Sequence, residues 1–264
     1  MRKLLLLLIT LMLSGFTMSQ LATPEQYTNW ETSNTYIAGT GITALGTIIC
    51  LATKQPLEIT PQAGPSINWI NTDTQLTQLL QSYGTEKGSL WGYSVGATIT
   101  KNKEIMSYKL GLFFESKGWS YSNNSYLIYT DNQGNIIQNI KVNTTGYDRL
   151  NYLTIPLTIG VHTNTKISLS VDLGGFISLP ISENHRSTTN GITSSDFEPI
   201  YKIGPNFGMI TNFGVKIPVN DKIDIKFDTR QLSSLNDCMK SQIGKSFNQS
   251  VQLLIGLNIK LNNN

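Results

Sequence analysis

The sequence has few of the residues on which metal and nucleophilic sites are usually built. Its 264 residues include only two cysteines and two histidines, and charged side chains make up 14% of the chain. Cys50 and Cys238 cannot form a disulfide-dense scaffold, and neither lies in the CxxC spacing of a zinc site. No HExxH motif and no phosphate-binding glycine loop occurs. The absence of these motifs excludes the common zinc-protease and P-loop classes.

Long apolar runs are also missing, except at the N-terminus. Residues 4–9 are uniformly apolar and follow Arg2 and Lys3, and small residues come next at Thr17 and Ser19. This is the pattern of a secretory signal, and the run is too short to anchor the chain in a bilayer. We therefore expect residues 1–19 to be a signal peptide and the protein to be exported.

A surplus of one charge is missing as well. The chain has 20 basic and 17 acidic residues, and removal of Arg2 and Lys3 brings the two closer to balance. A nucleic-acid-binding protein would need a basic patch. We therefore expect no nucleic-acid partner.

Strict alternation of apolar and polar residues is what the sequence has in abundance. In the segment IDIKFDTR, residues 223–230, a strand would have one apolar face and one ionic face. Such alternation occurs in eight segments: 57–69, 91–100, 106–115, 153–162, 166–177, 203–217, 222–230 and 250–261. Most have about 10 residues or more, which is typical of membrane-barrel strands rather than of average soluble strands.

The connections between these segments alternate in length. Short polar turns are expected at 101–104, 163–165 and 220–222, and longer loops at 70–89, 122–146, 182–199 and 232–245. This arrangement predicts an all-β fold, an eight-stranded antiparallel up-and-down transmembrane β-barrel with short periplasmic turns and long extracellular loops. The barrel domain would cover residues 57–264.

Two of the long loops carry local signals of their own. Residues 72–84, TDTQLTQLLQSYG, predict a short helix capped by Asp73 or Thr72. Residues 125–142 predict a hairpin that rises above the membrane, with its turn at 131–134. The oxygens of that turn do not have the spacing of a calcium-binding EF-hand.

The segment YDRLNYLTIPLTIGVHTNTKISLSVDLGGFISLPIS, residues 147–182, resembles the central hairpin of PorT-like outer-membrane β-barrel proteins of the Bacteroidetes type. The segment IGPNFGMITNFGVKIPVNDKIDIKFDTRQ continues the resemblance in the same order. GLNIKL is similar to the last strand of that family but lacks its usual terminal aromatic residue. The resemblance covers residues 57–261 and implies an eight-stranded barrel in the outer membrane.

The main alternative to a membrane barrel is a soluble lipocalin-like carrier, whose apolar face would lie inside. The apolar faces here are almost purely aliphatic or aromatic, and the opposite faces lack the dense Lys and Glu of a soluble surface. We therefore expect charged side chains to face the lumen as a structural ionic network, since isolated buried charges are costly. An ion-conducting path is the alternative. The expected members are Glu58, Lys109, Glu115, Lys117, Asp172, Lys216, Lys222, Asp224, Lys226, Asp228 and Arg230.

Aromatic residues near the predicted strand ends could form interfacial girdles or could reflect ordinary strand propensity. They are Trp69, Trp91, Tyr93, Tyr108, Tyr152, Tyr201 and Phe227.

Residues 20–56 precede the first alternating segment and are expected to be an N-terminal arm or a plug segment. Cys50 should lie on the periplasmic side and Cys238 in the last long loop. A disulfide between them would require residues 20–56 to thread the lumen, so the strand map disfavours it.

His162 and His185 are the only histidines. His185 lies beside Glu183, Arg186 and Ser187, which makes a hydrolytic cluster conceivable. Catalysis, however, needs groups that converge from different segments. We therefore expect no catalytic residue, no metal and no cofactor.

The function expected from these features is that of a non-enzymatic outer-membrane protein that acts through its extracellular loops or its periplasmic face. Its expected partners are outer-membrane lipid and other envelope or secretion-system proteins. The resemblance to PorT-like proteins implies an accessory role in protein secretion. The alternatives are a narrow channel for small solutes, an envelope enzyme and a soluble carrier.

Overall fold

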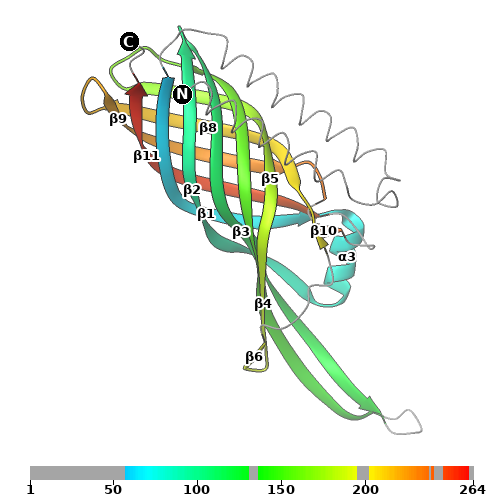
Figure 1. Ribbon diagram of the computed structural model, residues 1–264. Helices are drawn as coiled ribbons and strands as arrows, with labels where there is room; N and C mark the ends of the chain where they lie inside the picture. The colour runs from blue at the N-terminus through cyan, green and yellow to red at the C-terminus, as the bar shows by residue number, and fades with distance from the viewer. Residues whose placement is uncertain (1–56, 131–135, 195–201, 238, 241–245, 262–264) are drawn as a thin grey trace. The chain divides into compact units, whose positions relative to one another are not determined.

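The computed structural model describes residues 57–130, 136–194, 202–237, 239–240 and 246–261. Eight long strands form one closed antiparallel ring (Figure 1). They are β1 (Leu57–Thr72), β2 (Thr85–Lys103), β3 (Met106–Thr130), β4 (Ile136–His162), β5 (Ser168–Thr189), β8 (Asn206–Pro218), β9 (Ile223–Ser234) and β11 (Ser246–Leu261). Each pairs with the next one along the chain, and β11 closes the ring against β1. The predicted eight-stranded up-and-down barrel is confirmed.

Short connections join the strands at one end of the ring, which we call the turn end. They span residues 104–105, 163–167 and 219–222, close to the predicted turns. The other end, the loop end, carries α3 (Thr74–Ser82), and the Asp73 side chain caps this helix by accepting a hydrogen bond from the Leu76 backbone N–H at 2.9 Å. The predicted helix and its cap are confirmed.

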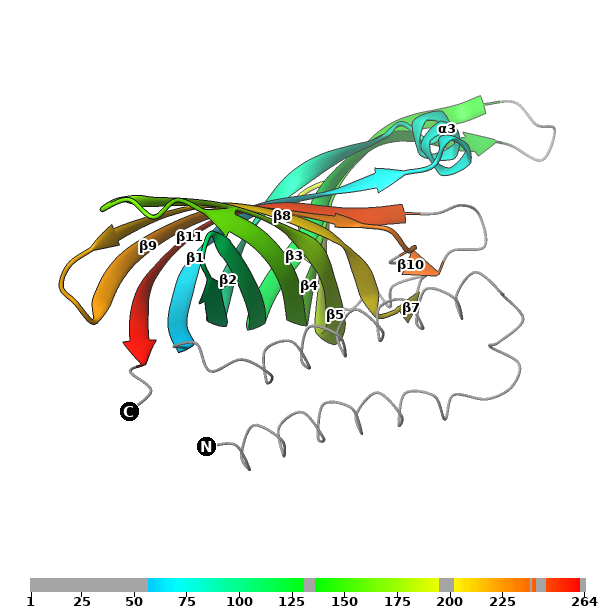
Figure 2. The ribbon, with the colours of Figure 1, turned by 90° about the horizontal axis from the view of Figure 1, so that it is seen from above.

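Three strands are much longer than a membrane requires. β3 has 25 residues, β4 has 27 and β5 has 22, whereas about 9–11 residues suffice to cross a bilayer. Their outer parts, residues 119–130 of β3, 136–149 of β4 and 184–189 of β5, form what we call the outer blade. It leaves the ring at the end where α3 lies (Figures 1 and 2).

The outer blade replaces much of two predicted loops. The expected hairpin is present, with Tyr126 opposite Lys141, but it continues the barrel strands without a break. Its turn, residues 131–135, lies outside the described residues. Smaller elements complete the loop end: β6 (Ile192–Ser194) pairs with β5, and β7 (Lys202–Ile203) pairs with β10 (Met239–Lys240).

The two faces of the ring have opposite chemistry, as the alternation predicts. Large apolar side chains remain exposed on the outer face: Val95, Leu112, Ile159, Val161, Leu169, Val171, Leu173, Met209, Phe213, Phe227, Leu253, Ile255, Leu257 and Ile259. Polar side chains are buried on the inner face, among them Thr60, Gln62, Thr98, Thr154, Asn212, Gln252 and Asn258. A soluble carrier would have the reverse arrangement. The outer face is therefore suited to lipid, and the lipocalin-like alternative is wrong.

No helix in the part of the chain that the structure describes is long and apolar enough to cross a membrane. The expected signal peptide, the arm or plug at residues 20–56, and both cysteines lie outside the described residues. Their predicted roles remain predictions.

Candidate functional site

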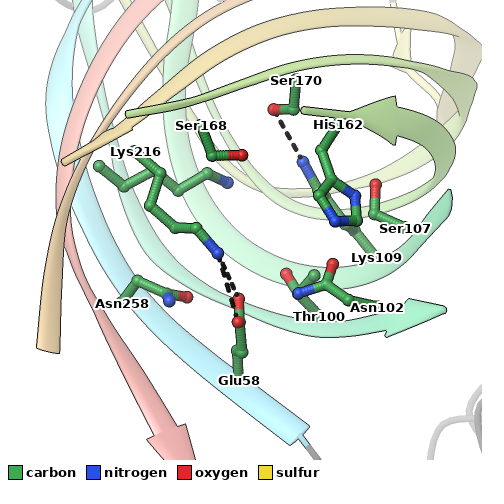
Figure 3. A pocket seen from close by; sticks show the side chains of 11 residues that line it. Glu58, Thr100, Asn102, Ser107, Lys109, His162, Ser168, Ser170, Lys216 and Asn258 are labelled. Carbon is green, nitrogen blue, oxygen red and sulfur yellow. Dashed lines mark hydrogen bonds and ion pairs between the residues drawn. The ribbon is translucent and has the colours of Figure 1, made fainter. Parts of the chain in front are cut away.

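The lumen at the turn end holds a small cluster of ion pairs. Lys216 Nζ lies 3.3 Å from Glu58 Oε1 (Figure 3). The same ammonium lies 3.9 Å from Asp224 Oδ2. Lys260 Nζ lies 2.9 Å from the other oxygen of Asp224. His162 lines the same space, a pocket of about 20 Å³. That volume has room for about one water molecule.

The middle of the lumen is organised around two buried carboxylates. Asp172 on β5 pairs with Lys109 on β3 at 2.5 Å and accepts a hydrogen bond from Ser107 at 3.0 Å. Asp228 on β9 pairs with Lys226 at 2.9 Å. The Asn212 amide on β8 links the two by donating to Asp172 at 2.8 Å and to Asp228 at 3.1 Å. The Lys109–Asp172 pair therefore joins strands that are not neighbours in the ring, whereas Lys226 and Asp228 pair within β9.

Glycine makes one of these cross-strand contacts possible. Gly160 on β4 faces the lumen opposite Asp172, and a Cβ atom there would lie 2.1 Å from Asp172 Oδ1. Real Cβ contacts are never this short, so no other residue fits without displacing the carboxylate. The absence of a side chain at position 160 lets Asp172 reach across β4 to Lys109.

A third buried carboxylate, Glu115, lies nearer the loop end. It accepts hydrogen bonds from Thr154 at 2.6 Å and Gln252 at 2.8 Å, and it pairs with Lys117 at 2.6 Å. The Lys117 ammonium also lies 5.6 Å from the ring centroid of Tyr152, within cation–π range. The oxygens of Glu115 are therefore bonded to three other side chains.

An apolar layer closes the lumen at the loop end. Ile70, Trp119, Leu150 and Tyr152 form one buried cluster, and Phe176, Ile210 and Leu232 form a second. Tyr152 is 0% exposed and faces inward, so of the two alternatives for the aromatic residues the girdle does not apply to it. Trp91, Tyr93 and Phe227 are exposed, as a girdle requires. Tyr201 lies outside the described residues.

The structure buries nine of the eleven predicted lumen residues in the ring, and Lys216 is partly buried. Lys222 differs: it lies in the exposed turn before β9, because the strand begins only at Ile223. The sequence analysis missed Lys260 and the amides of Gln62, Asn212, Gln252 and Asn258. Their signal was present, since each lies at an inward position of the same alternation.

A separate polar cluster lies in the outer blade. The imidazole of His185 on β5 contacts the Asp148 carboxylate on β4 through Nδ1. Its Nε2 lies 3.3 Å from the Tyr121 hydroxyl on β3, and the two rings are stacked. Burial raises the pKa of the Tyr121 phenol, and the charge of Asp148 adds to this. The cluster thus joins three strands. Its acidic member is Asp148 on β4 rather than Glu183, which lies two residues before His185.

Residues 92–96, GYSVG, match the GxSxG pattern of hydrolase nucleophiles. That pattern needs a sharp turn between a strand and a helix, whereas Ser94 lies within β2, faces the lumen and is 1% exposed. The match does not indicate a nucleophile. Among the described residues, no group of three His, Cys, Asp or Glu side chains is arranged to hold a metal.

Comparison with solved structures finds several outer-membrane proteins among the similar chains. Three solved barrels are similar in fold: Neisserial surface protein A (12% identity, 77% of this chain and 97% of that chain, TM-score 0.40), the outer membrane protein OprG from Pseudomonas aeruginosa (13%, 80% and 98%, 0.43), and the outer membrane protease OmpT from Escherichia coli (9%, 79% and 98%, 0.40). At these identities and TM-scores the likenesses carry no argument about this chain. No curated protein matches the chain.

A model of the outer membrane protein beta-barrel domain matches residues 52–240, which is more than half of the chain. The match covers the strands from β1 to β9, whose outer faces are aliphatic and whose lumen is polar. The chain therefore belongs to this family of outer-membrane β-barrel proteins and resides in the outer membrane.

Proposed function

We propose that this protein is a sealed, non-enzymatic barrel that anchors the outer blade and binds another envelope protein through it. The observation that carries the proposal is the length of the strands. β3 and β4 are more than twice as long as crossing the membrane requires. A chain that served only as a membrane anchor would not need a paired sheet beyond the bilayer.

The filled lumen supports a structural role for the barrel. Its two described pockets have volumes of about 20 Å³ and about 10 Å³, enough for about one water molecule each. The ion pairs of the middle layer and the apolar layer at the loop end lie one above the other. We therefore propose that the predicted ionic network stabilises the barrel and does not conduct.

The tip of the outer blade offers a specific mode of binding. β2 pairs with β3 only as far as Asn123, and β5 pairs with β4 only from Thr144 inward. Residues 125–130 and 136–142 therefore pair only with each other in the described part of the chain. Unpaired strand edges are templates for the addition of a strand from a partner. The resemblance to PorT-like proteins favours a partner in protein secretion.

A capture experiment with a shortened blade tests this proposal. Residues 125–142 are replaced by Asn-Gly, which suits a two-residue hairpin between the paired residues Asn124 and Asn143. Tagged wild type and the shortened variant are recovered from gently solubilised outer membranes. We expect a protein that co-purifies with wild type to be lost from the variant, while electrophoretic heat-modifiability shows both barrels folded. Equal recovery with both would contradict blade binding and favour the periplasmic face.

The channel alternative is tested in planar lipid bilayers. We expect the wild-type protein to give no steady, salt-dependent openings. Regular openings that scale with salt concentration would replace the sealed barrel with a narrow channel.

A further inference from the structure

A lysine, a carboxylate and a side-chain amide lie together in the part of the lumen nearer the loop end. Lys117 and Glu115 belong to β3, and Gln252 belongs to β11. Lys117 Nζ lies 2.6 Å from Glu115 Oε2, and the Gln252 amide donates to Glu115 Oε1 at 2.8 Å. The exposed fractions of the three residues are 3%, 0% and 0%. One buried carboxylate therefore bridges an amine and an amide, away from bulk water.

Aromatic and aliphatic side chains border the nitrogen of Lys117. Nζ lies 5.1 Å from the ring centroid of Phe176 and 5.6 Å from that of Tyr152. Leu150, which is opposite Lys117 on β4, is 2% exposed. A lysine held in apolar surroundings is one of the nucleophiles that proteins use, because hydration does not mask its amine. The surroundings of Lys117 therefore suit a reacting group as well as a structural one.

The amide of Gln252 is only half satisfied by its surroundings. Its Nε2 donates to Glu115, but its Oε1 is buried and has no hydrogen-bond partner among the described residues. A buried polar atom without a partner is costly and calls for an explanation. The Gln252 carbonyl thus lies beside a nucleophile and an acid–base group, and its oxygen has not yet been given a donor.

We propose that Lys117 and Gln252 become joined by an isopeptide bond once the barrel has closed, with Glu115 as the proton carrier. The Lys117 ammonium gives one proton to the Glu115 carboxylate, and the free amine then attacks Cδ of Gln252. Glu115 passes its proton to Nε2 as the bond from Cδ to Nε2 breaks, and it takes the second proton from the Lys117 nitrogen. Ammonia leaves, Glu115 remains protonated, and nothing is oxidised or reduced.

The products fit the site better than the reactants do. A buried ion pair is replaced by a neutral amide and a neutral carboxylic acid, so no charge has to be kept out of water. The protonated Glu115 can donate to the Gln252 oxygen that has no partner before the reaction. The bond would connect β3 to β11 past β2 and β1, and so across the junction that closes the ring. This covalent lock is independent of the proposed partner of the outer blade.

The test compares the mass of the full chain in urea with its mass after refolding in maltoside micelles. We expect the refolded chain to be lighter by about 17 Da, because the reaction releases ammonia. Trypsin does not cut at a modified lysine, so digestion should release residues 110–141 linked to residues 246–260. An unchanged mass in the folded chain would overturn the proposal. A loss of about 18 Da would indicate release of water and a bond to a carboxylate, which also overturns it.

Matched variants identify the three groups. Lys117→Met and Gln252→Leu each remove one reacting group, Glu115→Gln removes the proton carrier, and all three should keep the mass of their unfolded chains. Lys260→Gln removes a different lumen lysine, near the turn end of β11, and should still lose ammonia. Loss of ammonia that persists in Gln252→Leu, or that disappears in folded Lys260→Gln, would overturn the assignment. The linked wild-type peptide decides the matter even where a variant fails to fold.

Discussion

Lys109 Nζ lies 2.5 Å from Asp172 Oδ2, although the two residues belong to β3 and β5, with β4 between them. The carboxylate is 0% exposed and the Lys109 side chain 8%. Ser107 and Asn212 donate to the same carboxylate. These contacts therefore connect β3, β5 and β8 in a part of the lumen where water has little access.

Removing one charge of the Lys109–Asp172 pair should lower the free energy of unfolding more than removing both charges does. In Asp172→Asn the buried Lys109 keeps no ionised partner at 2.5 Å, so we expect a loss of about 3–5 kcal/mol in the free energy of unfolding. The double variant Lys109→Met/Asp172→Asn should recover most of this loss. Urea unfolding in micelles, followed by tryptophan fluorescence, measures both. Lys222→Met, in the exposed turn, should stay within about 0.5 kcal/mol of wild type. A double variant as unstable as the single one would contradict the pairing.

Gly160→Ala should destabilise the barrel by about 1–3 kcal/mol, because the new methyl group overlaps the Asp172 carboxylate and the Val171 carbonyl. Gly175→Ala is the matched control, since its nearest atom would be 3.5 Å away, an ordinary contact. We expect Gly175→Ala to be nearly neutral in the same unfolding measurement. Equal stabilities of the two variants would show that close approach at position 160 is unimportant.

The phenol of Tyr121 should ionise above the ordinary tyrosine pKa of about 10. Because the folded-state pKa is raised, its contribution to stability is fully present below pH 10 and is lost as the pH rises through the folded value. The difference in absorbance at 295 nm between wild type and Tyr121→Phe isolates this group from the other tyrosines. A difference titration centred at or below pH 10 would contradict the buried contact with His185 and Asp148.

Loss of the helix cap should loosen α3 without affecting the barrel. Asp73→Ala removes the acceptor for the Leu76 N–H and should cost about 1 kcal/mol of helix stability. Faster hydrogen exchange at residues 74–82 measures this effect. Asp73→Asn, which can still accept the bond, should exchange nearly as slowly as wild type, as should Asp221→Ala in the distant turn.

The alternation of the sequence predicted the ring, its orientation and nine of the buried charged residues, because side-chain direction in a strand is set by parity alone. It did not predict that Asp172 pairs with Lys109 rather than with another lumen cation. That choice depends on the stagger between strands and on a gap at Gly160, and neither follows from the pattern of a single strand.

The outer blade was predicted only in part for a related reason. Beyond the bilayer, residues such as Ser122, Asn123 and Asn124 no longer alternate in hydrophobicity, so periodicity gives no sign that the strand continues. The Asp148–His185–Tyr121 cluster was missed because its members converge from three strands, and His185 reaches the inner side only after a register shift between Asn151 and Tyr152. Parity counted from the membrane part of β5 would place it outside.

The seam between β1 and β11, in which Leu57 lies opposite Leu261, has a consequence for biogenesis. β1 pairs with β2 and with β11. It cannot pair with β11 until that last strand has been synthesised, so every partial ring has strand edges without a partner strand. Residues joined across this seam are far apart along the chain, which makes closure a late and slow event. Until closure, β1 and β11 each keep one edge whose backbone N–H and C=O groups have no partner strand.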